Sequence, residues 1–376
     1  MGIGNELIGN LEQLLVSSVL RKKSLFRMVG TGSQCSKAEI EIEQMFPDMH
    51  CLLLPSATIG TAMVLELLCL KPGQEVLISP FGWVANWSCI QRAGLVPRFL
   101  PLDKDLQLEP DAVKARINEL TGAVIVTHLQ GRGQQKVAEI SALCKAAGIP
   151  LLEDIAQSYG VSIHQKRAGT FGDAAWCSFN HNKILSAGDG GFLLVKEGDF
   201  FSKVCALHDQ GNILIGGKRR RLENNVEPGV SLRINEITGA TIRAQIARFN
   251  FIRARINRLN CLLELVIKEK FNLRILPTCL GDIPFTVLFE KPTISNYPSM
   301  ADTGWHVALE VPWLWDFCQT AIRMDSEINE TIHRLDAVSA IGAGFIDPYY
   351  GIRLGLEITD SPDDIDHLIT QLKEVL

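Results

Sequence analysis

The sequence predicts an α/β fold whose larger part is a mostly parallel sheet covered by helices. Between about residues 50 and 200, short apolar segments alternate with stretches of helical spacing. Such alternation is typical of strands joined by crossover helices, which build a parallel sheet with helices on its faces. A chain of 376 residues exceeds one ordinary core, so we expect a large and a small lobe.

The spacing of apolar residues gives the individual elements of this alternation. The expected strands are Glu75–Ser79, Val96–Leu100, Ala123–His128, Pro150–Asp154, Ala174–Phe179 and Phe192–Val195. The expected helices are Thr61–Leu70, Asn86–Arg92, Pro110–Glu119 and Val137–Ala147, preceded by an N-terminal helix over residues 6–20.

We place the division between the two domains near residue 240. Residues 1–240 would form the large domain, and 241–376 a connector helix with a small α/β C-terminal domain. The helical pattern of the connector begins near Asn235 and runs to about Phe271. We expect the small domain to end in a strand over Tyr350–Ile358 and a helix over Pro362–Val375.

Composition excludes several classes of function. The net charge of −5 argues against a general nucleic-acid binder. No apolar stretch approaches the roughly twenty residues that a membrane span needs, and no signal peptide is evident, so we expect a cytoplasmic protein. The ten cysteines are scattered without a CxxC pair, so we expect neither a disulfide framework nor a metal site.

A lysine and an acid stand where a pyridoxal phosphate (PLP) site needs them. Asp154 ends one expected strand, and Lys183 follows another, five residues before a Gly-rich turn that begins at Gly188. A lysine amine forms a Schiff base with the PLP aldehyde. A carboxylate pairs with the pyridinium nitrogen and keeps the ring able to accept electrons. Because ligands gather at the carboxyl ends of parallel strands, both residues are expected in one site.

The phosphate of PLP requires N–H donors at the start of a helix. Ser56 and Thr58 precede an expected helix and add hydroxyl groups, and Ser178 is a further hydroxyl near the lysine. A serine or threonine before a helix is more often only an N-cap, so this motif by itself is weak.

The ring of PLP needs flat or small neighbours. Trp83 could stack on it, although a core tryptophan is an equal alternative. Ala156 comes two residues after Asp154, so on a continuing strand it would face the same way and leave room for the ring. Gln157 could donate to the phenolic oxygen, or could be a buried structural amide.

Two histidines and one basic run remain open. His128 ends an expected strand at the same rim and is a site-lining candidate, although a lone histidine is more often structural. His181 more plausibly lines the lysine turn than acts in catalysis. Lys218–Arg221 could reach a nucleotide diphosphate, but a solvated basic loop is the alternative.

Together these parts resemble the DegT/StrS family of PLP-dependent sugar aminotransferases, over about residues 50–245. Seven motifs occur in family order and spacing. They are Ser56–Thr58, Pro72–Val76, Pro80–Trp83, Thr127–Gly131, Glu153–Gln157, Ser178–Lys183 with Gly188–Gly191, and Ser231–Ile237. The resemblance implies a fold-type I architecture, in which two copies of the chain form a homodimer with shared active sites.

The resemblance also implies a role for each matching residue. Lys183 would be the Schiff-base lysine, Asp154 the pyridine partner, Gln157 the donor to the phenolic oxygen and Trp83 the stacking ring. Phosphate would be held by Ser56, Ala57, Thr58 and Ser178, and by Ser231 across the dimer. Ala57 stands where the family has glycine, so its backbone must avoid the left-handed region. Ser231 replaces asparagine, which shortens the reach toward the partner.

The function implied is a ping-pong aminotransferase working through an internal aldimine on Lys183. It would move an amino group from glutamate or glutamine to a keto-sugar, often nucleotide-linked, or to a keto-cyclitol. One alternative is a PLP-binding protein of this fold without turnover, with a regulatory or structural role. A sugar dehydratase ranks lower, because such relatives carry histidine at the position of Lys183. A Rossmann-type nucleotide-binding module is disfavoured, because no GxGxxG motif follows an early strand.

Overall fold

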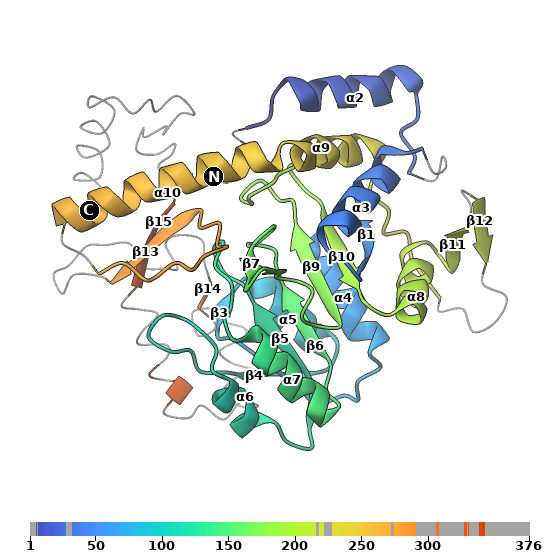
Figure 1. The fold of residues 1–376 in the computed structure, drawn as a ribbon. Coiled ribbons are helices and arrows are strands. Elements are labelled where there is room, and N and C mark those ends of the chain that lie inside the picture. Colours follow the sequence, from blue (N-terminus) through green and yellow to red (C-terminus); the bar gives the residue numbers. More distant parts are fainter. Residues whose placement is uncertain are drawn as a thin grey trace.

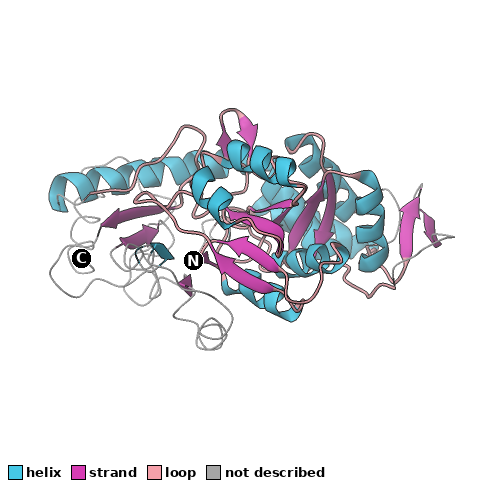
Figure 2. Ribbon diagram, turned by 90° about the horizontal axis from the view of Figure 1, so that it is seen from below, coloured by secondary structure: helices cyan, strands magenta, loops and turns pink. Residues whose placement is uncertain are grey.

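The centre of the protein is a seven-stranded sheet with helices on both sides (Figures 1 and 2). This computed structural model describes residues 5, 7–27, 32–215, 218–221, 228–271 and 274–290, with short pieces at 306–307, 327–328, 330 and 338–342. The predicted elements Tyr350–Ile358 and Pro362–Val375 lie outside the described residues, and the domain boundary near 240 stays a prediction.

The strand order in the central sheet is β1-β10-β9-β6-β5-β2-β4. All neighbours from β9 to β4 are parallel, whereas β10 runs antiparallel to both β9 and β1. The strands are β1 His50–Leu54, β2 Glu75–Ile78, β4 Val96–Phe99, β5 Thr121–Thr127, β6 Leu151–Asp154, β9 Ala174–Ser178 and β10 Gly191–Val195. The mostly parallel α/β sheet expected from the sequence is confirmed.

Burial of the sheet on both faces explains its composition. Every residue of β5, β9 and β10 is buried, which is why these strands read as continuous apolar runs rather than as alternating patterns. The helices that cover the sheet or flank it are α2 Asn10–Lys22, α3 Gln34–Met45, α4 Ala57–Leu67, α5 Val84–Arg92, α6 Pro110–Arg116, α7 Val137–Ala147 and α8 Gly198–His208.

The expected connector is two helices rather than one. α9 covers Glu236–Ala247 and α10 covers Phe249–Phe271, with Arg248 between them. In Figure 1 α9 runs beneath α2, and α10 leads away from the central sheet toward a separate pair of strands, β13 Thr286–Glu290 and β15 Val338–Gly342.

Smaller pairs of strands complete the described chain. β3 Phe81–Gly82 pairs with β14 His306–Val307, so a C-terminal segment lies beside the residue that precedes Trp83. β7 Ser162–Ile163 pairs with β8 Lys166–Arg167, and β11 Asn212–Ile215 pairs with β12 Lys218–Arg221.

Candidate active site

Asp154 is the last residue of β6 and lies buried in the molecule, with 4% of its surface exposed. Its Oδ1 accepts from the backbone N–H of Ala156 at 2.8 Å, and its Oδ2 accepts from Asn86 Nδ2 at 2.6 Å. Burial raises the pKa of the Asp154 carboxyl, while these two hydrogen bonds and the nearby charge of Lys183 oppose that rise. The carboxylate is therefore oriented through both of its oxygens.

Lys183 lies in the turn between β9 and β10, and its side chain is half-buried. The turn is closed by its own hydrogen bonds, including Lys183 N to Asn180 O at 3.0 Å and His181 N to Gly188 O at 3.0 Å. Burial lowers the pKa of the Lys183 amine, and the carboxylate of Asp154 partly opposes this effect. The two charged groups are thus close enough for each to shift the pKa of the other.

Trp83 is not part of the hydrophobic core. It caps the N-terminus of α5 with 44% of its surface exposed, and its ring centroid lies 6.0 Å from Lys183 Nζ. The alternative of a buried core tryptophan is wrong, because nearly half of Trp83 is exposed, whereas Trp87 and Trp176 are almost fully buried. An exposed ring beside a lysine amine is a surface on which a flat ligand could stack.

The residues expected to hold phosphate lie around the start of α4. Ser56 is the N-cap, and its hydroxyl accepts from Ile59 N at 3.4 Å, which is the capping role foreseen as the alternative. Ala57 is the first residue of the helix and is absent from the described residues with positive φ, as its side chain requires. Thr58 is exposed at the same end.

Sheet register brings Ser178 to this helix start. Gly191 pairs with Ser178 on one side and with Leu54, two residues before Ser56, on the other. A side chain at Gly191 would come within 2.7 Å of Ala57 N, so the glycine allows α4 to begin directly against β10. The four predicted residues 56, 57, 58 and 178 therefore lie at one edge of the sheet.

Gln157 and Ala156 follow β6 in a turn. Gln157 is buried, and its Oε1 accepts from Gln130 N at 3.0 Å, which makes the Nε2 group the end that could donate to a ligand. The argument that Ala156 continues the strand and faces the same way as Asp154 is wrong. β6 ends at Asp154, because the backbone turns to place the Ala156 N–H on the Asp154 carboxylate.

His128 has a structural environment. It is fully buried, its Nδ1 accepts from Gln134 N at 3.0 Å, and its Nε2 therefore carries the proton and donates to Glu153 Oε2 at 3.0 Å. This is the structural histidine foreseen as the alternative. His181 is exposed on the lysine turn.

Two of the predicted contacts lie elsewhere on the chain. Ser231 is exposed and forms a β-bridge with Asp209, and its reach toward a second copy stays a prediction. Lys218–Arg221 forms β12, in a ribbon beside α8 at the edge of the molecule (Figure 1). Whether that basic run meets a substrate also stays a prediction.

Two residues near Asp154 were not foreseen from the sequence. Asn86 donates to the carboxylate, and Thr61 lies behind Asn86 with its hydroxyl 3.4 Å from the amide oxygen. Both are buried polar side chains, Thr61 on the largely apolar α4 and Asn86 on the mixed α5, and a polar residue on the inward face of an expected helix was the available signal.

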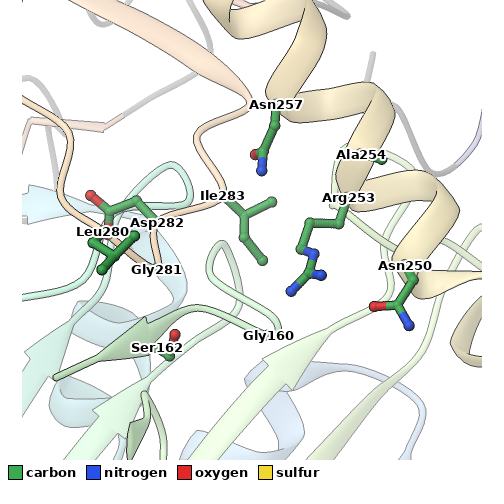
Figure 3. Close-up of a pocket in the computed structure, with 10 residues that line it drawn as sticks. All are labelled: Gly160, Ser162, Asn250, Arg253, Ala254, Asn257, Leu280, Gly281, Asp282 and Ile283. Carbon is green, nitrogen blue, oxygen red and sulfur yellow. The ribbon is translucent and has the colours of Figure 1, made fainter. Parts of the chain in front are cut away.

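A pocket of about 380 Å³ lies away from these residues, between α10, the segment around Gly160 and the loop at 280–283 (Figure 3). The side chains of Arg253 and Asn257 extend from α10 toward it. None of the predicted site residues lines this pocket. In the described part of the chain, no group of His, Cys, Asp and Glu is arranged to hold a metal, and no helix is long and apolar enough to cross a bilayer.

Comparison with known proteins identifies the family. The model of the DegT/DnrJ/EryC1/StrS aminotransferase family matches residues 8–270, which is more than half of the chain. The chain belongs to this family. The likeness seen in the motifs is therefore confirmed, and the DegT/DnrJ/EryC1/StrS match extends further toward both ends than the motifs did.

Curated relatives of this DegT/DnrJ/EryC1/StrS chain act in amino-group chemistry by their names. L-glutamine:2-deoxy-scyllo-inosose aminotransferase of Streptomyces lividus is 29% identical over 226 residues, covering 58% of this chain and 53% of the relative. GDP-perosamine synthase of Vibrio cholerae is 29% identical over 189 residues, covering 50% and 51%. The chain thus spans about half the length of the curated relatives it matches.

Solved structures of the same fold match almost the whole chain. An aminotransferase from Streptoalloteichus hindustanus aligns with a TM-score of 0.79 at 19% identity, covering 98% of this chain and 96% of the other. A GDP-4-keto-6-deoxy-D-mannose-3-dehydratase from E. coli aligns with a TM-score of 0.79 at 17% identity, covering 99% and 98%. The fold-type I architecture is confirmed, and at these identities the likeness shows the fold alone.

Proposed function

We propose that this protein is a PLP-dependent aminotransferase with Lys183 and Asp154 as its catalytic pair. The observation that carries the proposal is the juxtaposition of a half-buried lysine amine, a buried carboxylate and an exposed tryptophan ring at one edge of a parallel sheet. Membership in an aminotransferase family supports it.

The residues present fit such a cofactor. Gly191 leaves a space beside Ala57 N that a Cβ atom would fill. The first N–H groups of α4 can therefore point toward a phosphate. Burial raises the pKa of the Asp154 carboxyl, but the donors Ala156 N–H and Asn86 and the charge of Lys183 favour its ionised form, which is the form that pairs with a protonated ring nitrogen. The lowered pKa of Lys183 suits an amine that must attack an aldehyde. Gln157 Nε2 would donate to the phenolic oxygen.

The bound cofactor would supply an aromatic ring that accepts electrons from the substrate carbon. Lys183 Nζ would bind the aldehyde and, once a substrate amine displaces it, would move a proton to and from the substrate α-carbon. Asp154 would keep a proton on the ring nitrogen through its ionised oxygens. Trp83 would cover one face of the ring and keep water from it.

We assign the amino donor as glutamate or glutamine, and the acceptor as a keto-sugar, often nucleotide-linked, or a keto-cyclitol. The names of the relatives support both choices, since one names L-glutamine with a cyclitol and another a GDP-linked amino sugar. We further place the reaction in the cytoplasm, in a homodimer in which Ser231 of one copy reaches the phosphate of the other.

Cofactor attachment is the first test. The protein is incubated with PLP, reduced with borohydride and digested, and the peptides are weighed by mass spectrometry. We expect the cofactor mass on the peptide that contains Lys183. Lys183→Ala should abolish the attachment, whereas Lys196→Ala, which removes an exposed lysine, should not. Attachment that survives in Lys183→Ala would reject the assignment.

Turnover is the second test, because it separates the alternatives. Adding glutamate or glutamine should convert the bound cofactor to its amine form, seen as a change in its absorption band. A band that responds to no amino donor would favour a binding protein without turnover. Supplying a nucleotide-linked keto-sugar should then give an amino sugar, whereas a deoxy-sugar product would identify a dehydratase.

A further inference from the structure

Asp154 is held by a side chain that belongs to none of the sequence motifs. Asn86, in the first turn of α5, donates from Nδ2 to Asp154 Oδ2 at 2.6 Å. Both residues are buried, each with 4% of its surface exposed. The other oxygen, Oδ1, accepts from Ala156 N at 2.8 Å, so Asn86 is the side-chain partner that orients this carboxylate.

The orientation of Asn86 is itself determined by Thr61 of α4. The Thr61 hydroxyl lies 3.4 Å from Asn86 Oδ1 and 3.3 Å from Ala57 O, and it can share its hydrogen between these two acceptors. Because the amide oxygen of Asn86 faces this donor, its NH₂ group faces Asp154. The Thr61 side chain is almost fully buried, so solvent does not compete for these bonds.

This row of three side chains connects the separate parts of the proposed cofactor site. Thr61 is one helical turn after Ala57, where the phosphate would bind, and Asn86 is three residues after Trp83, which would cover the ring. Asp154 ends β6. Two helices and one strand are therefore joined at the carboxylate that would pair with the ring nitrogen.

The charges around Asp154 decide what the amide contributes. The charge of Lys183 acts on the carboxyl from the turn after β9, and the other titratable groups nearby are His128, which directly follows β5, and the Cys177 thiol of β9. Burial favours the neutral acid, whereas a hydrogen bond donated to the carboxylate favours the ionised form. The Asn86 amide can only donate to this carboxylate and cannot take its proton, so it stabilises the charge without competing for the ring nitrogen.

We propose that Asn86, oriented by Thr61, is a positioning residue that keeps Asp154 ionised and aimed at the pyridine nitrogen of the cofactor. The inference rests on the proposed function and deepens it, since it names what sets the acid side of cofactor binding. A buried asparagine with a merely structural role would affect stability and leave the pH dependence of binding unchanged.

The test measures PLP binding to cofactor-free protein by absorbance titration across a pH series. Asn86→Leu keeps the side-chain volume but removes the hydrogen-bond donor. The pH at which PLP binding is lost on acidification should then rise by about one unit, because the free energy of a hydrogen bond to a charged group corresponds to a pKa shift of about that size. Thr61→Val keeps Asn86 as the donor to Asp154 but removes the hydroxyl that orients the Asn86 amide. It should therefore move the midpoint pH of PLP binding in the same direction, but by less.

A matched control is Asn260→Leu on α10, where the buried amide donates to Glu264 instead of Asp154. This variant should keep the wild-type midpoint even if it lowers stability. If Asn86→Leu does not fold, the isosteric Thr61→Val carries the test. The inference is overturned if a folded Asn86→Leu loses PLP at the same pH as wild type. If Asn86→Leu cannot be obtained, the same result in Thr61→Val overturns it. Wild-type protein that binds no PLP overturns the proposed function instead.

Discussion

At the scale of single residues, Glu153 shows how a motif can combine structure with chemistry. It is fully buried, and its carboxylate accepts four hydrogen bonds, from the backbone N–H groups of Gly169, Phe171 and Gly172 and from His128 Nε2. Four donors offset the cost of burying the charge. Glu153 thus anchors the loop 169–172 beneath β6, while its neighbour Asp154 faces the proposed cofactor.

Glu153→Gln should destabilise the protein by roughly 3 kcal/mol, because the amide NH₂ would face backbone donors that then lack an acceptor. Urea unfolding measures this change. Glu66→Gln, at an exposed position on α4, is the control and should change stability by no more than about 0.5 kcal/mol. A Glu153→Gln variant as stable as the control would show that these four bonds contribute little.

We expect the rate of PLP attachment to depend on pH, because the Lys183 amine must lose its proton before it reacts. Only the neutral amine attacks an aldehyde, so the loading rate should rise about tenfold per pH unit until the pKa of Lys183 is reached. Burial lowers that pKa, so the plateau should begin below pH 10.5. Stopped-flow absorbance measures the rate.

The charge of Asp154 provides the matched comparison for this experiment. Because the carboxylate opposes the lowering of the Lys183 pKa, Asp154→Asn should move the plateau to lower pH. A plateau that moves upward in Asp154→Asn would contradict the electrostatic coupling between the two residues.

At the scale of elements, the meeting of α4, β9 and β10 depends on one missing side chain. A Cβ at Gly191 would lie 2.5 Å from Cys177 O and 2.7 Å from Ala57 N. Both neighbours are backbone atoms, so they cannot swing aside as a side chain could. The start of α4 reaches the edge of the sheet because β10 has no side chain at that point.

Gly191→Ala should therefore destabilise the protein by roughly 1–3 kcal/mol and weaken PLP binding, because α4 must move away from the sheet. Chemical unfolding and a PLP titration measure the two effects. Gly198→Ala is the control, since a Cβ there would meet only His50 Nε2 at 3.9 Å. If Gly191→Ala keeps the wild-type affinity for PLP, the start of α4 does not bind the phosphate of PLP.

The turn that carries Lys183 is also tied to elements distant in the sequence. Gln245 of α9 is fully buried, and its Oε1 accepts from Ser186 N at 3.2 Å while its Nε2 donates to Glu12 at 2.8 Å. A single amide thus connects the lysine turn to the N-terminal helix α2. The lysine turn is therefore hydrogen-bonded to a residue about sixty positions later, and through it to one more than 170 positions earlier.

At the scale of the whole molecule, Glu12 joins the N-terminal helix to the junction of α9 and α10. Its carboxylate accepts from Arg248 at 2.8 Å, from Gln245 at 2.8 Å and from Gly9 N at 2.9 Å. Burial by itself would raise the pKa of Glu12, but these donors outweigh it and lower the pKa below its ordinary value of 4.5. Arg248 also donates to Leu7 O at 2.7 Å.

A depressed carboxyl pKa predicts stability that depends on pH. The contribution of Glu12 is fully present above its unfolded pKa of 4.5 and is lost as the pH falls through the lower folded value. Near pH 7, Glu12→Gln should therefore have a free energy of unfolding about 2 kcal/mol lower than wild type, measured by urea unfolding. The difference should narrow as the pH falls below 4.5. A gap that stays constant over this range would exclude a role for the charge.

Most strands of the central sheet could be predicted from the sequence alone. The parallel strands from β2 to β9 lie within one or two residues of their predicted positions, because strands buried on both faces are continuous apolar runs. The Glu-Asp pair and the lysine turn were found for a similar reason, since each follows directly on such a strand. Local composition alone was enough to place these elements.

The tertiary structure decided what no local pattern contains. The reversed direction of β10, between β1 and β9, depends on which strands become neighbours, and the contact of Arg248, between α9 and α10, with Glu12 forms only once α2 has packed there. The row from Thr61 through Asn86 to Asp154 draws on three elements spread over some ninety residues. Apolar periodicity follows from burial of each segment by itself, whereas a hydrogen bond between buried side chains exists only once separate segments have packed together.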